Sequence, residues 1–94
     1  MSKLTLNLIA EEYNELREAI AEKDIIATAD ALCDLLYVIY GTGDEFGMDL
    51  DGCFDRVHRS NMSKFVNGKP ILREDGKILK GPNYFPPDFQ GVLF

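Results

Sequence analysis

The 94-residue sequence has few cysteines and no long apolar segment. Its two cysteines, Cys33 and Cys53, form neither a C-x-x-C pair nor a disulfide framework, which favours a reducing, cytoplasmic location. The first residues, Met1–Leu4, lack the apolar core of a signal peptide, and the longest apolar run, Leu35–Tyr40, is too short to span a bilayer. We therefore expect no membrane partner. The net charge of −6 also argues against a general nucleic-acid-binding protein.

The charged residues are divided unevenly along the chain. Residues 11–34 contain eight acids and two bases, a local net charge of −6. Residues 56–80 contain seven bases and two acids, a local net charge of +5. Acidic side chains can bind a metal ion, and basic side chains can bind phosphate groups attached to it. The same asymmetry also fits two oppositely charged surfaces that attract each other.

Apolar spacing and capping residues predict three helices followed by an irregular tail or small hairpin. The first two helices are expected at about residues 8–22 and 25–40, and a third, capped by Asp49 or Asp51, is expected to end near Phe65. Asn7 and Asp24 are the expected N-caps of the first two helices, and Gly41 and Gly43 are expected to end the second. The predicted fold class is therefore all-α. Because the second helix is apolar nearly all round, we expect a second copy to complete the bundle, as a homodimer or homotetramer.

Acidic residues recur at helical spacing on the first two predicted helices. Asp30 and Asp34 are four residues apart on the mostly apolar second helix, where two like charges are unfavourable unless a cation lies between them. On the first helix, Glu15 can share a site with either Glu12 or Glu11. Antiparallel packing of the two helices would bring these acids together. A site made only of carboxylates selects Mg²⁺ or Mn²⁺ over Zn²⁺.

At these acids the sequence resembles a known family. The segments EEYNEL, residues 11–16, and ADALCDLLY, residues 29–37, are similar to the all-α nucleoside triphosphate pyrophosphohydrolases of the MazG-like and phosphoribosyl-ATP pyrophosphohydrolase-like type. Glu12 and Glu15 match the E-x-x-E pair of that family, and Asp34 matches the final residue of its E-x-x-D pair. The resemblance implies one MazG-like domain with a helical core at about residues 8–66 and a C-terminal extension.

The match departs from the family pattern at one position of the second helix. Ala31 stands where E-x-x-D would place Glu, and Asp30 is one residue earlier. Asp30 can still reach the same face as Asp34 because the two are four residues apart. The number of metal ligands on this helix therefore stays open.

The third helix and the tail extend the resemblance. Residues 57–64, VHRSNMSK, are similar to the stretch in which the family binds the triphosphate, which implies this role for Asn61 and Lys64. The tail, with Lys77 and Lys80, also resembles the phage and bacterial branch of the family. These two lysines are expected to close over the phosphates.

The chemistry that the resemblance implies is Mg²⁺-dependent hydrolysis of a nucleoside triphosphate between its α and β phosphates, with Mn²⁺ as a possible substitute. The products are a nucleoside monophosphate and pyrophosphate, which suits control of the nucleotide pool. Glu12 or Glu15 would act as general base, and Tyr37 would line the nucleotide pocket. One alternative substrate is phosphoribosyl-ATP. Another alternative, which Ala31 keeps open, is an oligomeric module that binds nucleotide or metal without turnover.

Overall fold

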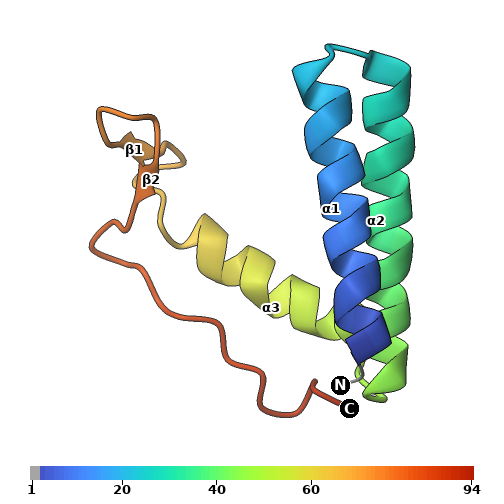
Figure 1. The fold of residues 1–94 in the computed structure, drawn as a ribbon. Helices are drawn as coiled ribbons and strands as arrows, with labels where there is room; N and C mark the ends of the chain where they lie inside the picture. The colour runs from blue at the N-terminus through green and yellow to red at the C-terminus, as the bar shows by residue number, and fades with distance from the viewer. Residues whose placement is uncertain (1–2) are drawn as a thin grey trace. The chain divides into compact units, whose positions relative to one another are not determined.

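The structure is a computed structural model, and it describes residues 3–94 (Figure 1). Its elements in chain order are α1 (Lys3–Ala21), α2 (Ile25–Glu45), α3 (Leu50–Met62), β1 (Ile71–Leu72) and β2 (Ile78–Leu79). They form two compact units, of which the first ends at Met48 and the second comprises Asp49–Phe94. The mostly helical chain, with one small hairpin, confirms the predicted all-α class. The assignment of all 94 residues to one domain stays a prediction.

In the first unit, α1 and α2 pack side by side as an antiparallel helical hairpin (Figure 1). The link between them is short because α1 ends in a Schellman motif. The backbone N–H of Asp24 donates to the carbonyl of Ala19 at 3.1 Å, and that of Lys23 donates to Ile20 at 3.1 Å. Lys23 adopts a positive φ of 55° at the position where this motif favours glycine. Asp24 then caps α2, as expected, through its side chain and the N–H of Ala27.

The contact between α1 and α2 is made by small and apolar side chains. Ala19 on α1 and Ala31 on α2 are buried, and Ile9, Leu16 and Leu35 are half-buried. Near the open end of the hairpin, the Thr5 hydroxyl donates to the Glu45 carboxylate at 2.7 Å.

The outward side of α2 is apolar and exposed. Ile25, Ile26 and Tyr37 are 79%, 81% and 84% exposed, respectively. The 21-residue helix α2 contains an 18-residue window with a mean hydropathy of 1.4, so it is long and apolar enough to cross a membrane by length and composition alone. A core helix of a soluble protein passes the same test when it is covered. In a single copy of the chain most of this surface is uncovered.

Two predicted helix ends were wrong. Asn7 is not an N-cap, because α1 already begins at Lys3 among the described residues. Gly41 and Gly43 do not end α2, which continues to Glu45. Gly43 is buried inside the helix, and its carbonyl accepts the N–H of Met48 at 2.9 Å. The glycine with a C-terminal role is Gly47, whose φ of +69° follows the cap residue Phe46.

In the second unit, α3 is capped by Asp49, whose side chain accepts the N–H of Gly52 at 3.0 Å. Asp49 was one of the two expected caps. The helix ends at Met62, slightly before the predicted residue 65. Asn67 and Gly68, with φ of 52° and 75°, form the tight turn that joins Val66 to Lys69.

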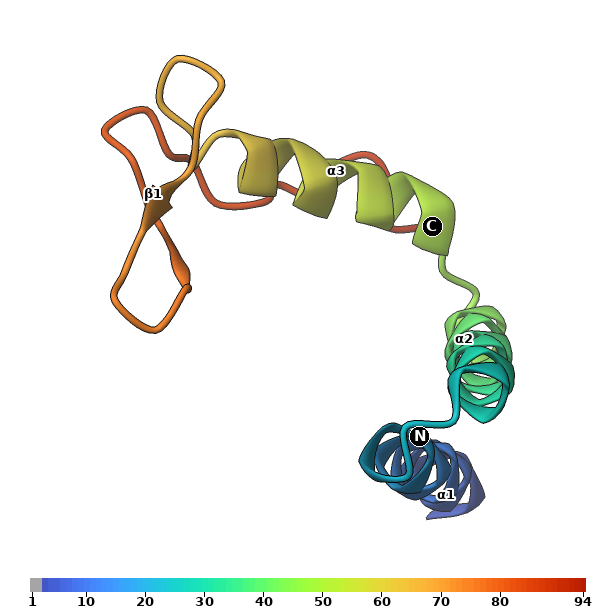
Figure 2. The same cartoon turned by 90° about the horizontal axis from the view of Figure 1, so that it is seen from above.

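The chain then forms the β1–β2 hairpin and returns along α3 as an extended arm, residues 84–94 (Figures 1 and 2). Side chains along one stripe of α3 bind backbone carbonyl groups of this arm. Ser60 Oγ donates to the carbonyl of Phe85 at 2.8 Å, and Arg56 Nη1 donates to that of Asp88 at 3.1 Å. The N–H of Asp49 donates to the carbonyl of Leu93 at 3.0 Å. Ser60 is 2% exposed, which makes it the buried polar residue at the centre of this contact.

Candidate functional site

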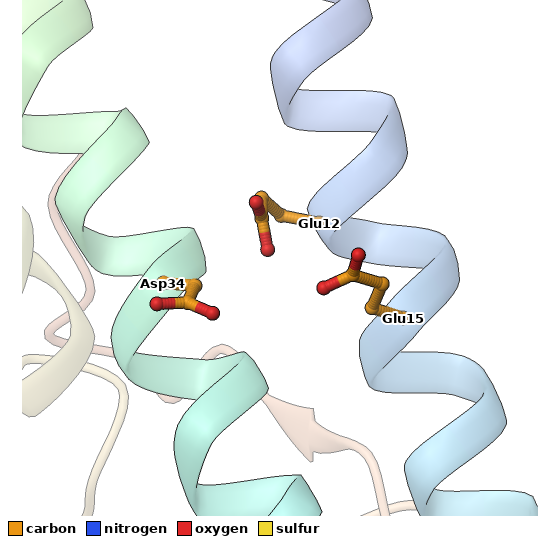
Figure 3. Close-up of side chains that lie close together, drawn as sticks. All are labelled: Glu12, Glu15 and Asp34. Carbon is orange, nitrogen blue, oxygen red and sulfur yellow. The ribbon is translucent and has the colours of Figure 1, made fainter.

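Three carboxylates meet between α1 and α2. Glu12 and Glu15 project from α1 toward Asp34 on α2 (Figure 3). One oxygen from each of the three lies within 4.8 Å of the others. Glu12 and Glu15 share a face because they are three residues apart, and the antiparallel hairpin sets that face opposite Asp34. The structure thus brings together the three acids that match the family motif most directly.

Glu12 lies at the inner edge of this acidic cluster, which we define as Glu12, Glu15 and Asp34. Its Oε2 is buried and has no hydrogen-bond partner in the described part of the chain. Burial of the carboxyl group raises the pKa of Glu12 above its ordinary value, and the negative charges of Glu15 and Asp34 raise it further. A buried oxygen without a partner, among like charges, is an arrangement that a cation would stabilise.

The donor set of the acidic cluster fits a hard divalent cation. It offers carboxylate oxygens only, which suit Mg²⁺ or Mn²⁺, and the free Oε2 of Glu12 provides a ligand atom that nothing else uses. Three protein ligands also leave coordination positions for water or phosphate oxygens. Glu12, Glu15 and Asp34 can therefore hold such an ion and a phosphate group bound to it.

The two other predicted metal ligands lie outside the acidic cluster. Glu11 and Asp30 are both exposed, and neither belongs to the group of converging oxygens. Along the axis of α2, the Cα atom of Asp30 lies about 6 Å before that of Asp34, because each residue adds about 1.5 Å. A role for these two residues as ligands stays a prediction.

Tyr37 lines an open groove along the exposed side of α2. The groove has a volume of about 430 Å³, and its lining residues are Cys33, Leu36, Tyr37, Tyr40, Gly41 and Asp44. Tyr37 is 84% exposed and follows Asp34 by three residues, which places the groove beside the acidic cluster along the same helix. Its aromatic ring is thus available for contact with a ligand.

The predicted phosphate-binding residues all belong to the second unit. Asn61 lies in the last turn of α3, and the carbonyl of Asn61 accepts the N–H of Lys64 at 3.2 Å, just after the helix ends. Lys77 lies between the hairpin turn and β2, and Lys80 follows β2 directly. The described residues show no carboxylate within 4.0 Å of any of these three lysine ammonium groups.

Sequence reasoning missed one partner of these lysines. The ring of Tyr84 lies under the Lys80 ammonium group, with 4.8 Å between Nζ and the ring centroid. The available signal was Gly81-Pro82, a dipeptide that marks a turn and so brings residues 80 and 84 together.

Comparison with known proteins identifies the family of this chain. Residues 1–61 match the phosphoribosyl-ATP pyrophosphohydrolase family, and this range includes all three residues of the acidic cluster. The chain is also 42% identical, over 92 residues, to an uncharacterized protein of Acanthamoeba polyphaga mimivirus. That match covers 96% of this chain but only 33% of the viral protein. The chain therefore spans about a third of the length of the curated relative it matches.

The family match extends over more than half of the sequence and contains the converging acids. The chain belongs to the phosphoribosyl-ATP pyrophosphohydrolase family, within the MazG-like superfamily of nucleoside triphosphate pyrophosphohydrolases.

Proposed function

We propose that this chain is a pyrophosphohydrolase that uses a divalent metal ion, Mg²⁺ or Mn²⁺, to convert a nucleoside triphosphate to a nucleoside monophosphate and pyrophosphate. The observation that carries the proposal is the convergence of Glu12, Glu15 and Asp34 within 4.8 Å, inside the segment that matches the family. Surface acids normally repel one another and separate. Three that converge around a buried, unpartnered oxygen support a site for a cation and its phosphate ligand.

Glu12, Glu15 and Asp34 would hold the metal ion. When bound, Mg²⁺ supplies positive charge to the phosphate oxygens and offsets the charge that develops during phosphoryl transfer. The side chains then have a second task, which is to bind and orient water. One of the carboxylates Glu12 and Glu15 accepts a proton from the attacking water.

The reaction balances as a simple hydrolysis. The water oxygen forms a bond to the α phosphorus, and the bond from that phosphorus to the α–β bridging oxygen breaks. Pyrophosphate leaves with the electron pair of the broken bond, and the carboxylate carries the proton from water. Asn61 and Lys64, in the second unit, stay the predicted phosphate-binding residues, because an amide N–H group can donate to phosphate oxygens and an ammonium group offsets their charge. Tyr37 offers its ring to the nucleotide base.

Phosphoribosyl-ATP is a second candidate substrate with about equal support. The family match itself favours it, because that is the activity in the family's name. The residues beyond the match, which ends at Asn61, do not favour either substrate. Lys64, Lys77 and Lys80 provide cations for a triphosphate chain, which both substrates carry.

The test is release of pyrophosphate from a panel of ribo- and deoxyribonucleoside triphosphates and phosphoribosyl-ATP, each with Mg²⁺ or Mn²⁺. We expect release from at least one substrate and its loss in Asp34→Asn. Glu18→Gln is the matched control, since it removes one exposed carboxylate charge from α1 outside the acidic cluster. Cleavage only at the terminal phosphate would refute the proposed reaction. Folded protein that binds Mg²⁺ but releases no product would support a binding module instead.

We also propose that a second copy of the chain covers the exposed side of α2, giving a homodimer or homotetramer. Ile25, Ile26 and Leu36 leave a large apolar surface for such a contact. A bilayer is a poorer occupant, because it would enclose the charged Asp30 and Asp34 in the middle of the helix. Light scattering should give a mass of at least two chains, and Ile26→Lys should lower it. A monomeric mass of 10.6 kDa at micromolar concentration would refute the proposal.

A further inference from the structure

A turn at residues 81–84 anchors the start of the C-terminal arm to the end of α3. The N–H of Gly81 donates to the carbonyl of Lys64 at 3.0 Å, and the N–H of Tyr84 donates to the carbonyl of Gly81 at 3.2 Å. Pro82 occupies the second position of this turn, where its fixed φ is favourable. The turn brings the Tyr84 ring to the Lys80 ammonium group, 4.8 Å from Nζ to the ring centroid.

Gly81 makes this arrangement possible because it has no side chain. A Cβ atom at this position would lie 2.7 Å from the carbonyl oxygen of Lys64 and 2.9 Å from Cγ2 of Val66. One of these neighbours is backbone, so it cannot move aside without shifting the end of α3. The absence of a Cβ is therefore what lets Gly81, the residue directly after Lys80, hydrogen-bond to Lys64.

The cations around this turn differ in how their charge is compensated. Arg59 and Arg73 form salt bridges with Asp55 and Asp75. Within residues 49–94, Lys80 has an aromatic ring beside it and no carboxylate within 4.0 Å. An aromatic ring orients an ammonium group without neutralising its charge. The Lys80 charge thus remains available to an anion from outside.

The negative end of the α3 dipole, about half a charge, could weaken such an attraction. The carbonyl groups at this end of α3 already accept hydrogen bonds, however. Those of Arg59, Asn61 and Met62 accept the N–H groups of residues 63, 64 and 65, and that of Lys64 accepts Gly81. Two full positive charges at Lys64 and Lys80 exceed the residual dipole charge.

We propose that Lys80 binds the linked phosphates of the pyrophosphate group together with Lys64, and that Gly81 and Tyr84 are its positioning residues. This deepens the proposed function and rests on it, because pyrophosphate is the group that would leave. A flexible lysine on its own would lose side-chain entropy on binding. Contact with Tyr84 restricts the Lys80 side chain before the ligand arrives, so less side-chain entropy is lost on binding.

The test is the affinity of the full chain for inorganic pyrophosphate in the presence of EDTA, measured by ³¹P NMR titration. Omitting the metal isolates the contribution of the lysines. We expect Lys80→Gln to weaken binding about fivefold, the effect of a favourable exposed charge contact. Lys69→Gln is the matched control, because it removes the same charge from the same basic segment and should leave the affinity unchanged.

Two further variants separate positioning from general stability. Tyr84→Phe keeps the ring and should bind pyrophosphate like the wild type, whereas Tyr84→Leu should bind it more weakly while its circular dichroism is unchanged. The difference between wild type and Lys80→Gln should also shrink as NaCl is added, since salt screens the charge.

Three outcomes would overturn the proposal: no pyrophosphate binding by the wild type, equal affinity in Lys80→Gln, or an equal loss in Lys69→Gln. None of these depends on turnover. A chain that binds pyrophosphate through Lys80 but hydrolyses no triphosphate would refute the proposed function and leave this site in place. Hydrolysis of a triphosphate together with unchanged pyrophosphate affinity in Lys80→Gln would refute the Lys80 site and leave the proposed function in place.

Discussion

Replacing Asp34 by Asn should stabilise the metal-free protein and destroy its response to Mg²⁺. In the acidic cluster, Asp34 has two carboxylate neighbours whose nearest oxygens lie within 4.8 Å. At that distance each pair of charges repels by about 0.9 kcal/mol in the dielectric of water. Salt reduces the sum of the two to about 1 kcal/mol. For a chain of this length, that gain corresponds to a rise in Tm of about 5 °C.

Added Mg²⁺ should stabilise the wild type much more than it stabilises Asp34→Asn. At ten times its Kd, a ligand that binds only the folded state stabilises that state by about 1.4 kcal/mol. The wild type should gain this amount, and Asp34→Asn should gain little because one of three ligands is missing. The order of stability therefore reverses between EDTA and Mg²⁺.

Urea denaturation at fixed protein concentration, with EDTA or with Mg²⁺, measures both effects. Glu18→Gln is the control and should respond to Mg²⁺ like the wild type, because Glu18 is exposed and lies outside the acidic cluster. The reasoning is refuted if Asp34→Asn is destabilised in EDTA, or if it keeps the full Mg²⁺ response. Identical behaviour of the two variants would show that the cation does not bind where the three oxygens converge.

Three further predictions concern other parts of the molecule. Lys23→Gly should raise the free energy of unfolding by about 0.5–1 kcal/mol, since glycine adopts the positive φ at this position without strain; urea denaturation of both proteins measures it. Ser60→Ala should cost about 1–2 kcal/mol and speed amide hydrogen exchange in the arm, because the carbonyl of Phe85 loses its buried donor. In EDTA, stability should fall as pH rises from about 4.5 through the raised pKa of Glu12, since the folded state binds that proton more tightly than the unfolded state; Glu12→Gln should flatten this slope in a pH series of urea denaturations.

The sequence was sufficient for the elements whose signals are local. Asp24 and Asp49 cap helices because a short side chain with an oxygen satisfies free N–H groups within the same turn. The turn at Asn67 and Gly68 follows from two residues that tolerate positive φ. The Glu12–Glu15 pair meets Asp34 because spacing and a short link determine an antiparallel hairpin.

The predictions that were wrong or missing concern residues whose role depends on tertiary contacts. Gly41 and Gly43 look like a helix end, but packing of α2 overrides their low helix propensity, and Gly43 is buried. Asn7 looks like a cap until α1 is seen to begin one turn earlier. The Lys80–Tyr84 contact depends on a close approach between Gly81 and Lys64, which are far apart in sequence. No local pattern encodes that distance.

The arm along α3 has a consequence for how this protein can change over evolution. Its anchors are the carbonyl groups of Phe85, Asp88 and Leu93, which accept hydrogen bonds from the side chains of Ser60 and Arg56 on α3 and from the backbone N–H of Asp49, the cap of that helix. The path of the arm is thus encoded in a helix and its cap elsewhere in the chain. Side-chain replacements at the three anchor residues should leave these hydrogen bonds in place, because every residue type carries the same carbonyl. Insertion or deletion of one residue between two anchors should not be tolerated, since it would displace every later carbonyl from its donor.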